Sequence, residues 1–110
     1  MNELAELIDR IEGDGPLATA LRSALSERMA QDDKWGVQNH TPEWWLAILM
    51  EEVGELAQAI LETHFDNGPG ASHLRGMARI RNEAVQSCAV ALAMIECIDR
   101  IPNARPERTP

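Results

Sequence analysis

Four glutamates are the residues of this 110-residue chain whose type and spacing best fit chemistry at a metal ion. Glu51, Glu52 and Glu55 fall in one segment with helical periodicity, and Glu83 falls in a second such segment. At about 100° per residue, Glu52 lies inside the apolar arc of its helix, Glu55 at its edge and Glu51 farther toward solvent. Carboxylates at positions i and i+3 share one helix face, so Glu52 and Glu55 are close enough to share an ion.

Glu52 and Glu83 are both predicted to face packed neighbours, on two separate helices. A carboxylate in such a position is costly unless a cation or strong hydrogen-bond donors meet it. One coordinated site explains both acids more simply than two unrelated ion pairs, and oxygen ligands alone suit Mg²⁺ or Mn²⁺. The opposing interpretation is that such a glutamate run is an ordinary solvated helix face.

Four helices are predicted to position these side chains, over residues 2–12, 17–31 and 42–64 and from a Ser72 cap to about residue 100. Residues 32–40 are expected to form a loop, and a break is expected at residues 66–70. We expect a single all-α domain over residues 1–100 and a flexible C-terminal tail over 101–110. The side chains assigned to packing are Leu4, Leu7, Ile8, Ile11, Leu17, Leu21, Ala24, Leu25, Met29, Trp44, Trp45, Cys88 and Cys97.

Composition narrows the class of function. Hydrophobic residues make up 45% of the chain and aromatic residues only 4%, which favours helices over strands. The net charge of -8 argues against binding to a nucleic-acid polymer, although divalent cations would let an acidic protein bind a nucleotide. The N-terminal segment is acidic and no apolar stretch is long enough to span a membrane, so we expect a cytoplasmic protein.

Between residues 30 and 96 the chain resembles MazG-like nucleotide pyrophosphohydrolases. The resemblance rests on Lys34-Trp35-Gly36-x-Gln38, on the EExxE motif at 51–55 within a leucine-rich segment, and on Asn82-Glu83 opening an alanine-rich helix. It implies an all-α four-helix bundle that is completed by dimerisation or tetramerisation. It also implies Mg²⁺-dependent hydrolysis of (deoxy)nucleoside triphosphates to monophosphate and pyrophosphate.

The resemblance also implies a role for individual residues. Glu52, Glu55 and Glu83 would be metal ligands, and the fourth acid of the family falls on Gln86, whose neutral carbonyl oxygen removes one negative charge. Glu55 or Glu51 would be the base that takes a proton from the attacking water. The residues expected to bind substrate are Lys34 and Arg79 at the phosphates and Trp35 and Gln38 at the base.

Two alternatives remain open at the level of sequence. One is a related pyrophosphohydrolase with a narrower substrate, such as dUTP, dCTP or phosphoribosyl-ATP. The other is a non-catalytic helical oligomer that binds a nucleotide or a partner protein, with Gln86 as the sign of lost activity. Metal-stimulated turnover separates the second alternative from the first.

Overall fold

The computed structural model describes residues 2–65 and 71–102, and over these residues helices are its only regular secondary structure, as predicted. Helix α1 spans Glu3–Glu12, α2 Pro16–Trp35, α3 Pro42–Phe65 and α4 Ala71–Asp99. The break expected at residues 66–70 and most of the expected tail, 103–110, lie outside the described residues. No helix within the described ranges is long and apolar enough to cross a membrane.

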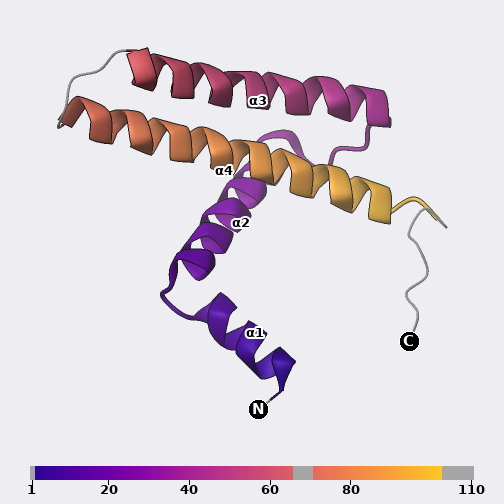
Figure 1. Ribbon diagram of the computed structural model, residues 1–110. Helices are drawn as coiled ribbons and strands as arrows, with labels where there is room; N and C mark the ends of the chain where they lie inside the picture. Colours follow the sequence, from indigo (N-terminus) through magenta and orange to yellow (C-terminus); the bar gives the residue numbers. More distant parts are fainter. Residues whose placement is uncertain (1, 66–70, 103–110) are drawn as a thin grey trace.

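Helices α3 and α4 form an antiparallel pair, and α2 crosses α4 near its middle (Figure 1). Helix α1 packs only against α2 among the described helices, at the end of α2 that points away from the pair. Near the start of α4, Gly76 allows a close approach to α3, because a Cβ atom at this position would collide with the side chain of Thr63. Helix α4 is the central element of the pair and the crossing, because it contacts both α2 and α3.

The helix ends show why the segments begin and end where they do. Asn2 caps α1 by accepting a hydrogen bond from the Ala5 amide at 2.7 Å. Thr41 Oγ1 accepts one from the Trp44 amide at 3.4 Å, and Pro42 opens α3 as predicted. The loop predicted to begin at residue 32 was wrong, because α2 continues to Trp35 and ends at Gly36, whose φ of 72° suits glycine.

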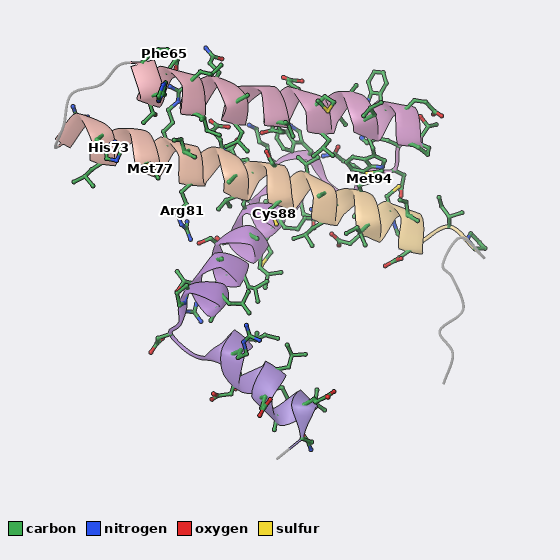
Figure 2. All side chains as sticks on the ribbon, in the orientation of Figure 1. Phe65, His73, Met77, Arg81, Cys88 and Met94 are labelled. Atoms are coloured by element: carbon green, nitrogen blue, oxygen red, sulfur yellow. The ribbon has the colours of Figure 1, made fainter. Side chains whose placement is uncertain are left out.

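The core lies between α3 and α4 and is small. Trp45 is 2% exposed and is the largest fully buried side chain among the described residues. It packs with Val90, Ala93 and Cys97 of α4. Ile48, Leu49 and Met94 are partly buried against this cluster, and Figure 2 shows Met94 at the α3–α4 interface.

Several residues assigned to packing do not pack within the chain. Helix α1 buries none of its residues. Helix α2 turns a face of small and polar side chains toward α4, including Ala24, Arg28 and Gln31, and leaves its leucine stripe exposed. Trp44 is 60% exposed, and Cys88 is exposed although Cys97 is buried as expected. Of the residues predicted to form the packing stripe of α2, only Ala24 is buried, and α2 is joined to α4 by the ion pair of Arg28 with Glu96.

Candidate functional site

Three carboxylates from two helices converge at the α3–α4 interface. Glu52 and Glu55 of α3 and Glu83 of α4 each place one oxygen within 4.8 Å of the others. Glu52 and Glu83 are half-buried and Glu55 is exposed, while Glu51 lies exposed beside them. The structure thus brings together acids that are 28 or more residues apart in sequence, with the unequal burial that the helical wheel predicted.

Two oxygen atoms of this cluster are buried without a hydrogen-bond partner. They are Glu52 Oε2 and Glu83 Oε2, which together with Trp45 Nε1 are the unpaired buried side-chain polar atoms among the described residues. Burial raises the pKa of Glu52 above its ordinary value, and repulsion from Glu55, then Glu83, Glu51 and Glu27, raises it further. A buried acid surrounded by like charges favours either a bound proton or a bound cation.

The donor set of the cluster suits a hard divalent cation. All the converging atoms are carboxylate oxygens, which Mg²⁺ and Mn²⁺ prefer and which zinc sites supplement with sulfur or imidazole. The buried, unpaired oxygens of Glu52 and Glu83 would gain a partner on metal binding. Exposed acidic clusters are also common in proteins without any ion.

A cavity of about 470 Å³ opens beside the acidic cluster. It is lined on the α2 side by Gln31 and Trp35, and on the α3 side by Trp45, Glu51 and Glu52. The remaining lining residues are Gln38, His40, Ile48 and Val90. The lining thus combines aromatic and aliphatic side chains with a few polar groups and two carboxylates, a combination typical of small-molecule pockets.

The segment between α2 and α3 is held in place over this cavity. Gln38 Oε1 and His40 Nε2 are hydrogen-bonded at 2.9 Å, and the His40 ring meets Trp45 edge to face with centroids 4.8 Å apart. Arg100, just after α4, donates to the Gln38 carbonyl oxygen at 2.9 Å and to Asn39 Oδ1 at 2.9 and 3.1 Å. Arg100 thereby anchors residues 38 and 39 from a distant part of the sequence, while His40 holds the side chain of Gln38, which lines the same cavity as Glu51 and Glu52.

Not every predicted substrate-binding residue lies at the cavity. Trp35 and Gln38 line it. Lys34 is exposed, with its Nζ 4.6 Å from the centre of the neighbouring Trp35 ring. Arg79 forms an ion pair with Glu62 of α3 instead. Gln86 is half-buried three residues after Glu83, and its role as a ligand stays a prediction.

Sequence reasoning missed Gln31 and His40 as lining residues. The predicted helix ended at Gln31. In the structure the helix continues, and Trp35 lies one turn after Gln31 on the same face. The signal that would have found it is Gly36, the residue that stops the helix in the structure. Searches with the chain against protein-family models, curated proteins and solved structures find no match.

Proposed function

We propose that this protein is a divalent-metal-dependent hydrolase that cleaves (deoxy)nucleoside triphosphates to monophosphate and pyrophosphate. The observation that carries the proposal is the pair of buried, unpaired oxygens of Glu52 and Glu83, which share a cluster of oxygen donors with Glu55. A structural cluster would be expected to satisfy these oxygens with an arginine or with backbone amides. The resemblance of the KWG and EExxE segments to MazG-like enzymes supports the same reaction.

In this proposal Glu52, Glu55 and Glu83 hold Mg²⁺, with Gln86 as a further oxygen donor. The metal would neutralise charge on the triphosphate and lower the pKa of the attacking water. Glu51 is exposed beside Glu52 at the edge of the cavity, and Glu55 is the exposed member of the cluster. Either carboxylate is open to solvent and is therefore placed to accept the proton of that water.

The adjoining cavity would hold the nucleoside. Trp35 offers a ring for stacking, and Gln31 and Gln38 offer amide groups that can both donate and accept hydrogen bonds at the base. The carboxylates at one end of the cavity then meet the phosphates only through a cation, since direct contact would set negative charge against negative charge. Glu52 belongs both to the lining of the cavity and to the acidic cluster, so the base and the metal would lie next to each other in the bound nucleotide.

We further infer that the chain acts as a homodimer or homotetramer. The apolar face of α1 and the leucine stripe of α2 are exposed in the single chain. Contiguous apolar surface of this kind marks protein interfaces in proteins that do not aggregate. A second copy is a suitable occupant because both helices present the same type of aliphatic side chain.

The test is pyrophosphate release from a panel of ribo- and deoxyribonucleoside triphosphates, with Mg²⁺ and with EDTA. We expect Mg²⁺-dependent release by the wild-type chain, and at least about a hundredfold loss of kcat/KM in Glu52→Gln, because a metal ligand supplies several kcal/mol of stabilisation in the transition state. Glu43→Gln is the matched control, since Glu43 is exposed on the same helix and outside the cluster. It should retain wild-type activity.

Two results would count against the proposal. The first is no Mg²⁺-dependent release from any nucleotide when a control enzyme works in the same assay. The second is equal activity in Glu52→Gln and Glu43→Gln. Activity confined to one pyrimidine triphosphate would keep the chemistry and narrow the substrate.

A further inference from the structure

Residues 37–41 form the linking segment between α2 and α3, which runs beside the carboxyl-terminal half of α4 (Figure 1). Gln38 and His40 of this segment line the nucleoside cavity. Among the described residues, no backbone-to-backbone hydrogen bond outside the helices involves residues 37–40. The conformation of this part of the cavity wall therefore depends on contacts made by side chains.

The end of α4 and the residue after it supply those contacts. Arg100 Nη2 donates to the Gln38 carbonyl oxygen at 2.9 Å. The same nitrogen and Arg100 Nε donate to Asn39 Oδ1 at 2.9 and 3.1 Å. Cys97 Sγ donates to the His40 carbonyl oxygen at 3.6 Å. Three consecutive residues of the linking segment are thus each held from the carboxyl-terminal end of α4.

The two lining side chains of the segment are fixed to each other and to the core. His40 Nε2 is hydrogen-bonded to Gln38 Oε1 at 2.9 Å. The His40 ring also meets the ring of Trp45, which is 2% exposed, with centroids 4.8 Å apart. A shift of the linking segment therefore moves Gln38 and His40 together, while Trp45 stays in the core between α3 and α4.

Arg100 acts on this segment from outside the cavity. Its side chain is exposed, and it does not belong to the cavity lining found in the described part of the chain. Cys97, in contrast, belongs to the buried cluster around Trp45, so a substitution there would also disturb the core. Arg100 is therefore the residue at which the position of the segment can be tested apart from core packing and from direct contact with a ligand.

We propose that Arg100 is a positioning residue for ligand binding, which holds the linking segment so that Gln38 and His40 stay in the wall of the nucleoside cavity. A planar guanidinium suits this role, because one group donates to the main chain of Gln38 and to the side chain of Asn39. Without it the segment populates other conformations, and the apparent affinity falls with the fraction of molecules in the competent one. The inference rests on the proposed function for the identity of the ligand.

The first measurement is the binding of the common deoxynucleosides in EDTA, since these probes carry no phosphate and need no metal. Proton–nitrogen correlation NMR follows the amides of the linking segment and the indole of Trp35, another lining residue, in one titration. We expect at least one nucleoside to shift these signals in the wild type, and Arg100→Gln to bind it at least about fivefold more weakly. Arg75→Gln removes the same charge at an exposed site near the other end of α4 and should bind as the wild type does.

Two further variants separate positioning from a general loss of stability. Arg100→Lys keeps a charged donor and should restore part of the affinity. Asn39→Ala removes the acceptor of two of the Arg100 hydrogen bonds, so its effect and that of Arg100→Gln should be less than additive in the double variant. Because Arg100 and Asn39 are exposed, these variants should fold, which urea unfolding checks.

The second measurement is steady-state hydrolysis of the preferred triphosphate with Mg²⁺. Arg100→Gln should raise KM at least about fivefold and leave kcat within about twofold, because the acidic cluster lies on α3 and α4 and not on the linking segment. Glu52→Gln, in contrast, should lower kcat.

The outcomes distinguish this inference from the proposed function. Equal nucleoside binding by Arg100→Gln and Arg75→Gln overturns the inference, as does the absence of nucleoside binding by the wild type. Hydrolysis with an unchanged KM in Arg100→Gln also overturns it and keeps the enzymatic proposal. Nucleoside binding that depends on Arg100, without Mg²⁺-dependent hydrolysis of any triphosphate, supports the inference and overturns the enzymatic proposal.

Discussion

At the scale of single residues, the acidic run divides into side chains with different environments. Glu52 is half-buried with an unpaired oxygen, whereas Glu51 and Glu55 are exposed. Burial and the neighbouring carboxylates raise the pKa of Glu52, so the fold disfavours its charged form when no cation is present. A bound cation would offset the repulsion among these carboxylates and so relieve this cost.

This environment predicts how stability depends on pH in EDTA. Between the ordinary pKa of a glutamate and the raised pKa of Glu52, the folded chain binds more protons than the unfolded chain. The free energy of unfolding that Glu52 contributes is therefore full below its unfolded pKa and is lost as pH rises through its folded pKa. Relative to the wild type, Glu52→Gln should become the more stable protein at neutral pH, and the difference should shrink in acid.

Urea unfolding followed by tryptophan fluorescence, at several pH values in EDTA, measures this difference. Glu43→Gln is the control and should follow the wild type, because Glu43 is exposed and outside the cluster. Mg²⁺ added at neutral pH should stabilise the wild type and leave Glu52→Gln unchanged. If the free energies of unfolding of wild type and Glu52→Gln changed with pH in parallel, the pKa of Glu52 would not be raised in the fold.

At the scale of elements, helix α2 lines the cavity with Gln31 and Trp35, and one arginine docks it on α4. Arg28 Nε donates to Glu96 Oε2 of α4 at 2.5 Å, and Arg28 Nη1 donates to Asp32 Oδ1 at 2.6 Å. The Arg28 side chain is only 10% exposed, while its two partners are about half exposed. Its pairing with Arg28 gives Glu96 a structural role.

Replacing Arg28 with methionine should loosen the docking of α2. We expect a loss of about 1–2 kcal/mol in the free energy of unfolding, because two charged hydrogen bonds are lost while water still reaches both carboxylates. Urea unfolding measures the change, with Arg10→Met as the control at an exposed site. A loss within about 0.5 kcal/mol, typical of surface substitutions, would show that apolar contacts alone hold α2.

At the scale of the whole molecule, the chain leaves much aliphatic surface uncovered. The exposed fractions of Leu4, Leu7, Ile8 and Ile11 on α1 are between 40% and 63%. Trp45 is the one large side chain that is fully buried among the described residues. A small domain with so few buried large side chains gains stability from association, because a partner covers surface that the chain cannot cover itself.

Leu7→Asp should therefore dissociate the assembly. Sedimentation equilibrium of the wild type should give two or four times the chain mass of 12.2 kDa. The aspartate places a charge in the apolar stripe, and we expect the dissociation constant to rise at least about tenfold. Ala5→Asp adds the same charge to α1 away from the stripe and should leave the mass unchanged. A monomeric wild type at micromolar concentrations would contradict the inference.

The sequence by itself determined the secondary structure and the relative burial of the acids. Capping residues such as Asn2 and the Thr41-Pro42 pair are local signals, so the starts of α1 and α3 could be predicted closely. Helical periodicity is also local, which is why Glu52 could be separated from Glu51 before the fold was known. The last turn of α2 was not predicted, because the helix was expected to end at Gln31 and not at Gly36, the glycine that ends it in the structure.

Tertiary structure decided which face of each helix packs against which neighbour, because the periodicity of a sequence carries no information about contacts between helices. Helix α2 docks through Arg28 and not through its leucines. The partner residue, Glu96, lies 68 positions away on α4, so the pattern of residues along α2 could not reveal this pairing. The convergence of Glu83 with Glu52, the cavity lined by Gln31 and the pairing of Arg79 with Glu62 all depend on the same contacts between helices. The pattern along a chain fixes the faces of each helix, whereas the energy of the contacts between helices selects among them.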